Sequence, residues 1–268
     1  SPDDERITEP RARESPVADP WITAEHPDPE GFHLRTIAAL LDAYCKSYEA
    51  GRMAVFLDFC SLEQAPRSEE AEERFRRGLK AINLIYAHQV SWVLCLTVMP
   101  PGTARGYDAR GWCFFERLVA GALKQTQYLL DVGKLRVAPD AVTNFHEQVA
   151  DVCDVGRRPP LTPAAFEAEL RERQFTNGST DHALVARLYG EFVEEALGAA
   201  TRLNFMNLRW GDAQAEELAA VLPLCGRVRE LELRNNDIGD RGAAALARSL
   251  PAGLETLDLC RNKNLTDE

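Results

Sequence analysis

The chain has 268 residues, of which 45% are hydrophobic and 27% are charged, a composition typical of folded globular proteins. Its formal net charge is −11, and because so acidic a surface repels phosphate backbones, the sequence predicts no nucleic-acid partner. The longest apolar stretch, residues 90–99, is far shorter than the roughly 18 residues of a membrane helix. We therefore expect no membrane partner and a cytoplasmic location.

Cysteine usage indicates free thiols rather than a disulfide framework or a metal site. The seven cysteines are spread along the chain, mostly within apolar runs, and no two of them form a Cys-x-x-Cys pair. An odd number of widely spaced cysteines is unlike a disulfide scaffold or a zinc site. The sequence thus predicts no metal ligands and fits a reducing compartment.

The N-terminal part is predicted to run from a tail into a helix and a strand. Residues 1–16 mix charges with three prolines and show no apolar periodicity, so we expect a disordered tail. Asp28 and Pro29 suit the N-cap and the first position of a helix, and apolar residues then recur at three- and four-residue spacing. Residues 53–59 are apolar apart from Asp58, which predicts a short, largely buried strand that ends on the carboxylate of Asp58.

The next elements continue this alternation. Ser68 can cap a helix whose first turn holds two glutamates, residues 90–98 predict a second buried strand, and residues 110–124 predict an apolar helix. Helices and strands that alternate in this way favour a parallel sheet with helices on both faces.

The segment that follows is less regular. Residues 132–137 fit a strand, and residues 144–152 fit a short helix. Two clearer helices come next, one capped by Thr162 and one after Thr180. We interpret the second of these helices as a hinge that leads into the last part of the chain.

The last part, residues 201–268, contains an internal repeat. WGDAQAEELAAVL at 210–222 aligns without gaps with IGDRGAAALARSL, 28 residues later, and LELRNN at 231–236 recurs as LDLCRN 26 residues later. Both copies of the second segment fit the frame Leu-x-Leu-x-x-Asn, formed by Leu231, Leu233, Asn236, Leu257, Leu259 and Asn262. In this frame the leucines fill a core beneath a short strand, and the asparagine satisfies backbone groups at the turn.

The repeat resembles the leucine-rich repeats of the ribonuclease-inhibitor class. That resemblance implies an α/β solenoid, which serves as a surface for a protein partner. The third copy stops at residue 268 before its helix, so we expect an incomplete array.

Residues 17–200 carry a second resemblance. The segments AVFLDFCSLEQ, EERFRRGLKAINLIYAH, SWVLCLTV and YDARGWCFFERLVAGAL occur in this order. They resemble the Toll/interleukin-1 receptor (TIR) domain, in which a strand with an aspartate, a polar loop, a helix, an apolar strand and a Trp-Cys-x-x-Glu element follow one another. The chain is similar, more closely, to algal and protist proteins that join a TIR-like module to leucine-rich repeats, with HPDPEG, RPPLTP and FTNGSTD as further shared segments.

This resemblance implies a TIR- or flavodoxin-like parallel sheet flanked by helices. The chain departs from the family at its opening strand, where Asp19 and Pro20 stand in place of apolar residues.

Some TIR domains hydrolyse NAD with the glutamate of the Trp-Cys-x-x-Glu element, and the resemblance implies this role for Glu116. A carboxylate suits the reaction because cleavage of the nicotinamide–ribose bond develops an oxocarbenium-like sugar. Trp112 and Tyr107, from this element and the loop before it, and Asp58, at the C-terminal edge of the sheet, are the residues we expect to bind substrate. NAD is then a substrate, and we expect no bound cofactor.

Two functions follow from these observations. In the first, the repeats bind a protein partner and the TIR-like domain self-associates or docks an adaptor, because many TIR domains are adaptors without catalysis. In the second, the chain is an NAD hydrolase that releases nicotinamide through Glu116 and is regulated by the repeats. The sequence leaves open whether the chain is an enzyme.

Overall fold

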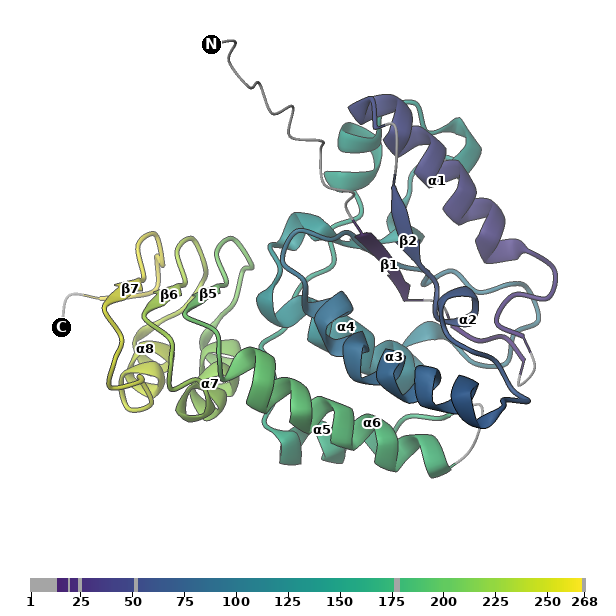
Figure 1. Ribbon diagram of the computed structural model, residues 1–268. Coiled ribbons are helices and arrows are strands. Elements are labelled where there is room, and N and C mark those ends of the chain that lie inside the picture. Colours follow the sequence, from purple (N-terminus) through teal and green to yellow (C-terminus); the bar gives the residue numbers. More distant parts are fainter. Residues whose placement is uncertain (1–13, 19, 24–25, 51–52, 176–178, 267–268) are drawn as a thin grey trace, which may run out of the picture.

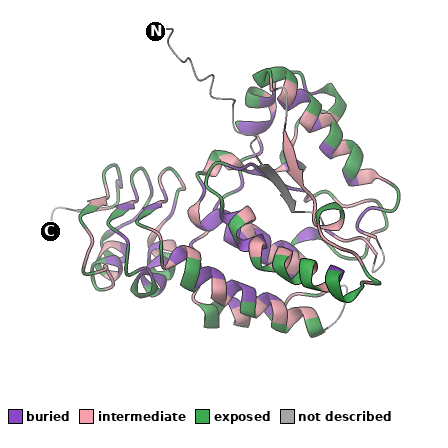
Figure 2. Ribbon diagram, in the orientation of Figure 1, coloured by how far each residue is buried: buried purple, intermediate pink, exposed green. Residues whose placement is uncertain are grey.

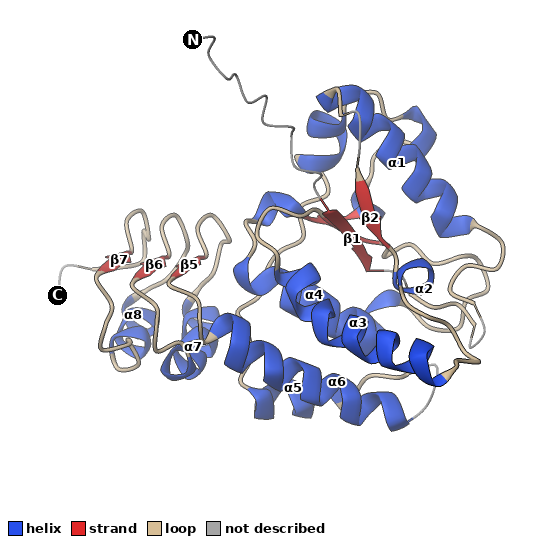
Figure 3. Ribbon diagram, viewed as in Figure 1, coloured by secondary structure: helices blue, strands red, loops and turns tan. Residues whose placement is uncertain are grey.

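The structure is a computed structural model that describes residues 14–18, 20–23, 26–50, 53–175 and 179–266. It is a mixed α/β protein with two small parallel sheets (Figures 1 and 3). The first sheet has the strand order β2-β1-β3-β4 and consists of β1 (Glu14–Ala18), β2 (Ala54–Phe56), β3 (Val93–Cys95) and β4 (Leu129–Asp131). The second has the order β5-β6-β7 and consists of β5 (Arg202–Asn204), β6 (Glu230–Glu232) and β7 (Thr256–Asp258).

Eight α-helices connect and cover the strands within the described residues. They are α1 (Phe32–Tyr48), α2 (Asp58–Ser61), α3 (Glu69–Ala87), α4 (Gly111–Leu123), α5 (Pro163–Leu170), α6 (Ser179–Phe192), α7 (Asp212–Val221) and α8 (Asp240–Ala247). Two π-helical turns add to these, His146–Ala150 and Val193–Leu197. In the part of the chain that the structure describes, no helix is long and apolar enough to span a membrane.

The two faces of the first sheet pack into different hydrophobic clusters. Because side chains alternate along a strand, Val93 and Cys95 of β3 lie in the cluster formed with α3, α4 and α6. Leu94 and Leu96 instead lie in the cluster formed with α1. The predicted parallel sheet with helices on both faces is thus present, and α5 and α6 add a further layer beyond α3 and α4 (Figure 1).

Several predicted elements are shifted in the structure. Residues 14–16, which we assigned to a disordered tail, belong to β1, and the rest of that tail lies outside the described residues. Helix α1 begins at Phe32 rather than at Pro29, because the Asp28 carboxylate accepts hydrogen bonds from the backbone N–H groups of Phe32 and Leu34 at 2.7 and 2.8 Å. Asp28 therefore caps the helix from a position about one turn before its N-cap residue, Gly31.

Other elements agree more closely with prediction or differ at their ends. Ser68 caps α3 as expected, accepting a hydrogen bond from the backbone N–H of Ala71. The strand expected at residues 132–137 lies instead at β4, three residues earlier, and residues 132–134 form a 3-10 turn. Val93–Cys95 is the paired part of the apolar run predicted as the second strand.

The second sheet repeats one local arrangement. The side chain of Asn236 accepts hydrogen bonds from the backbone N–H groups of Leu208 and Trp210, and it donates to the carbonyls of Phe205 and Leu233. Asn262 repeats the pattern one unit later, accepting from Ile238 and donating to the carbonyls of Leu233 and Leu259. Leu203, Leu231 and Leu233 are fully buried beneath these turns.

Replacing Asn236 with alanine should lower the free energy of unfolding by about 3 kcal/mol, because four buried backbone groups lose their partner. Chemical denaturation of the variant and the parent chain measures this difference. Asn264→Ala is the matched control, since the exposed Asn264 side chain makes one hydrogen bond, to the carbonyl of Asp237. A loss of stability at position 236 no larger than that at position 264 would contradict the prediction.

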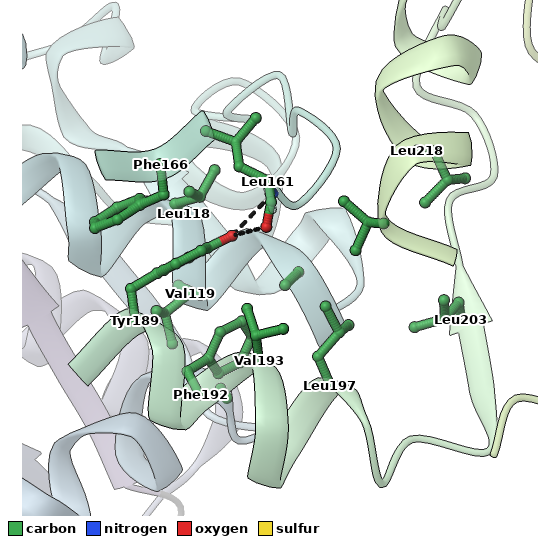
Figure 4. Packing of buried hydrophobic residues seen from close by; sticks show 14 of the residues in the cluster. Leu118, Val119, Leu161, Phe166, Tyr189, Phe192, Val193, Leu197, Leu203 and Leu218 are labelled. Carbon is green, nitrogen blue, oxygen red and sulfur yellow. Dashed lines mark hydrogen bonds between the residues drawn. The ribbon is translucent and has the colours of Figure 1, made fainter. Parts of the chain in front are cut away.

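The two parts of the molecule share one hydrophobic core. Figure 4 shows Tyr189, Phe192 and Leu197 on one side of a row of buried side chains and Leu203 and Leu218 on the other, and all five belong to one cluster of buried residues. Figure 2 shows the same buried stretch running from α4 and α6 toward α7. The helix after Thr180 is thus part of this cluster, which continues across the boundary that we expected at residues 200 and 201.

Candidate functional site

A cavity of about 680 Å³ lies between α2, α3, α4 and the start of α6. Three of the predicted site residues, Asp58, Trp112 and Glu116, are on its wall. Trp21, which follows β1, lines it as well, and Asp58 follows β2, so the cavity lies beyond the carboxyl ends of these parallel strands. This is where open α/β sheets bind ligands, because the strand order there forces successive loops apart.

Glu116 is buried on the cavity wall rather than exposed on the outside of its helix. It is only 4% exposed and hydrogen-bonds with the side chain of Tyr86 in α3. Burial, and after it the negative charges of Glu116 and Asp58, raise the pKa of Tyr86 well above its ordinary value. The phenol therefore stays protonated and donates its hydrogen bond to the Glu116 carboxylate, which holds that carboxylate in one orientation.

Asp58 occupies the first position of the short helix α2. One carboxylate oxygen accepts a hydrogen bond from the indole N–H of Trp21 at 2.7 Å, and the other accepts from the backbone N–H of Phe59 at 2.6 Å. Burial raises the pKa of Asp58, and these two hydrogen bonds oppose the shift without cancelling it. The ionised form of this carboxyl group is therefore less stable in the folded chain than in water.

Asp58→Asn should become relatively more stable than the parent chain as the pH rises. Because the pKa of Asp58 is raised on folding, the folded state holds its proton more tightly, and stability is lost as the pH rises from the ordinary value of 3.8 through the raised one. The amide removes that loss. Urea denaturation of both proteins at a series of pH values measures the difference in stability, and a pH-independent difference would contradict the prediction.

Aromatic side chains form much of the remaining wall. The indole N–H of Trp112 donates to the carboxylate of Asp181 at 3.0 Å, which fixes the ring between α4 and α6. Phe175 packs so closely on Gly111 that a Cβ at position 111 would lie 2.1 Å from its ring, so any larger residue there would displace this ring. Rings of this kind offer flat apolar faces to a planar ligand.

Two arginines bring positive charge to the same wall. Arg67 has its guanidinium 3.5 Å above the ring of Phe75 and also contacts Glu72, with its Nη1 atom 3.3 Å from the carboxylate. Arg110, at the N-cap of α4, is only 7% exposed, and its guanidinium donates to the backbone carbonyls of Trp21 and Arg105. Guanidinium groups at a cavity wall suit anionic parts of a ligand.

Tyr107 does not lie on the cavity wall, contrary to our expectation. Its side chain is 3% exposed, and its hydroxyl lies beside the thiol of Cys95 under the sheet. The tyrosine precedes α4 in a 3-10 turn that directs the ring into the core instead of toward the ligand space. Tyr107 thus packs in the core and does not contact the cavity in which we expected it to bind substrate.

The structure adds wall residues that sequence reasoning did not select: Trp21, Arg67, Arg110, Phe175 and Asp181. They come from five separate places in the chain. Arg110 lies within the segment YDARGWCFFERLVAGAL, and Phe175 and Asp181 are the first and last residues of FTNGSTD, so the resemblance included these three residues without giving them a role. Trp21 and Arg67 lie outside the segments named for the resemblance, and no spacing pattern marks them.

The arrangement combines three carboxylates, namely the buried Glu116, Asp58 at a helix start and Asp181 beside Trp112, with aromatic faces and two cations. No group of three His, Cys, Asp or Glu side chains within the described residues is placed to hold a metal ion. The side chains present can hold a polar, partly aromatic and partly anionic small molecule against Glu116.

Comparisons of the chain with protein-family models, with curated proteins and with solved structures find no match.

Proposed function

We propose that the chain is a nicotinamide-releasing NAD hydrolase whose α/β part has a TIR-like fold. The observation that carries the proposal is the position of Glu116, a mostly buried carboxylate on the wall of a 680 Å³ cavity that it shares with Asp58 and Trp112. A cavity of this volume is within the range of about 300–1,000 Å³ that small-molecule sites occupy.

The reaction that we propose breaks the bond between ribose C1′ and the ring nitrogen of nicotinamide. The bonding pair leaves with that nitrogen, so nicotinamide departs neutral and the sugar develops positive charge at C1′. A water oxygen then bonds to C1′ and loses a proton to solvent, giving ADP-ribose. The Glu116 carboxylate, oriented by Tyr86, stabilises the positive charge while it exists.

The other wall residues have roles in holding the substrate. Trp112 and Phe175 present apolar rings that suit the planar nicotinamide and adenine groups. Arg67 and Arg110 suit the pyrophosphate, because guanidinium groups bind phosphate oxygens with charge-assisted hydrogen bonds. The nicotinamide, the adenine and the pyrophosphate of NAD thus each have a chemically matched group on this wall.

The experiment is to incubate the purified full chain with NAD and to follow nicotinamide and ADP-ribose by chromatography. We expect both products to appear together in equal amounts. Their absence over a wide range of enzyme and NAD concentrations would refute the proposal.

A second candidate function is the binding of a protein partner by residues 201–268, which we propose form leucine-rich repeats of a solenoid. It is supported by the outward faces of β5, β6 and β7, where Arg202, Glu230 and Thr256 are exposed beside buried leucines. In this function the α/β part self-associates or docks an adaptor in the cytoplasm. Light scattering on the full chain tests self-association, and a strictly monomeric chain at high concentration would argue against it.

A further inference from the structure

Helix α4 separates the cavity that holds Glu116 from a second cavity of about 350 Å³. Phe114, Arg117 and Gly121 line the second cavity, and Trp112, Cys113 and Glu116 line the first. These two sets project from different sides of the helix because residues three and four apart share a face. The second cavity is therefore a separate space, and we call it the arginine cavity.

Four guanidinium groups surround the arginine cavity in a chain whose net charge is −11. They belong to Arg117, Arg157, Arg158 and Arg173, which come from α4, from the segment between β4 and α5 and from the turn after α5. Four like charges around one small space repel one another unless negative charge is placed among them.

The carboxylates of the described residues neutralise this group only in part. Arg158 forms a two-pronged pair with Glu169, each N–O distance being 2.8 Å, and its Nη2 atom also lies 3.6 Å from the carboxylate of Glu217. Arg173 reaches the Glu169 carboxylate at 3.9 Å. Arg117 pairs with Asp108 at 3.1 Å, but the Asp108 side chain is 83% exposed and its charge is screened by solvent.

Arg157 is the least neutralised of the four. It is 5% exposed and has no carboxylate within 4 Å among the described residues. Its guanidinium donates to the carbonyls of Gly121, Ala122 and Asn204, which uses three of its five N–H groups. Burial lowers the pKa of Arg157 to about 9, and the more distant charge of Asp154 opposes that shift. The cation thus stays charged at neutral pH in a place where charge is costly.

Two further features leave room for a ligand anion. The Nε–H of Arg173 is buried without a hydrogen-bond acceptor among the described residues. A Cβ built on Gly156 would meet nothing within 4 Å, so the space beside this backbone is open. The cavity volume equals that of about a dozen water molecules, which is more than one phosphate ion needs.

We propose that the arginine cavity binds a phosphate monoester of a small metabolite. Guanidinium forks match the oxygens of a phosphate, and such a group supplies the negative charge that the four arginines lack. The remaining volume, bordered by the ring of Phe114, accommodates the organic part of the ligand. This site is independent of the NAD reaction proposed for the cavity on the other side of α4.

Isothermal titration calorimetry of the full chain with ribose 5-phosphate tests the proposal. We expect saturable binding that weakens about tenfold or more in the double variant Arg117→Gln/Arg173→Gln. Arg171→Gln is the matched control, because Arg171 is exposed, pairs with Glu167 and does not line the cavity. Circular dichroism of each variant verifies that it is folded, and the side chains of both substituted arginines are partly exposed.

Three further titrations complete the test. Ribose without phosphate should not bind, and inorganic phosphate should bind more weakly with the same dependence on the two arginines. Glu116→Gln should leave the affinity for ribose 5-phosphate unchanged, so a failure of the NAD hydrolase proposal does not affect this result. Absence of binding, or binding that the arginine pair does not change, would overturn the proposal.

Discussion

Glu116→Gln should slow the release of nicotinamide from NAD about a thousandfold, which is the size of effect expected when a buried group that stabilises transition-state charge is lost. The amide has the shape of the carboxylate and still accepts a hydrogen bond from Tyr86, so the cavity keeps its form. Because the missing negative charge acts on the developing oxocarbenium ion, kcat should fall while KM for NAD changes little. Steady-state assays of product formation give both constants.

Arg117→Gln is the control for this experiment. It is the next residue on α4 but faces the arginine cavity, so the rate of nicotinamide release should stay within about twofold of the parent rate. Tyr86→Phe removes only the hydrogen bond that orients Glu116, and it should lower kcat about tenfold. If Glu116→Gln retains the parent rate, the carboxylate has no part in the reaction.

The sequence predicted the order of elements because that order depends on local patterns. Ser68 with two glutamates after it marks a helix start from its own chemistry, and the apolar run at residues 90–98 can only be a buried strand or helix segment. The register of the strands and the exact ends of the helices were harder to predict. Asp28 could cap a helix that begins at Pro29 or one that begins about a turn later, at Phe32. Only the tertiary contacts of the loop decide between these two helix starts.

The candidate site was predictable in part for a related reason. Glu116 and Trp112 share one helix, and Asp58 begins the short helix that follows a strand, so their positions follow from secondary structure. Asp181 and Phe175 reach the same cavity from more than 50 residues later in the chain, through the packing of α6 on α4. Tyr107 was predicted wrongly for the opposite reason. It lies in the expected loop, but its position in the sequence does not determine where the side chain points, and the ring is buried in the core.

Trp210→Ala should destabilise the whole chain, by about 3–5 kcal/mol, because it removes a large buried side chain from the core that joins the two parts. Trp210 is 2% exposed and stacks on Phe205 with ring centroids 4.7 Å apart. Its indole N–H also donates to the carbonyl of Arg157 at 2.9 Å, and Arg157 in turn donates to the carbonyl of Asn204. Loss of the ring therefore loosens both sides of the junction.

The fluorescence of this variant distinguishes a shared core from two independent domains. The chain has four tryptophans, and the three that remain after Trp210→Ala all lie in the α/β part. If the core is shared, the urea unfolding transition reported by these tryptophans should show the whole loss of about 3–5 kcal/mol. The reason is that the α/β part then unfolds together with the second sheet. Leu224→Ala is the control, because this side chain is 43% exposed and its loss should change the free energy of unfolding by no more than about 0.5 kcal/mol. An unchanged tryptophan midpoint in Trp210→Ala would mean that the α/β part folds by itself, and a buried contact between the parts would then stabilise only the part that contains the second sheet.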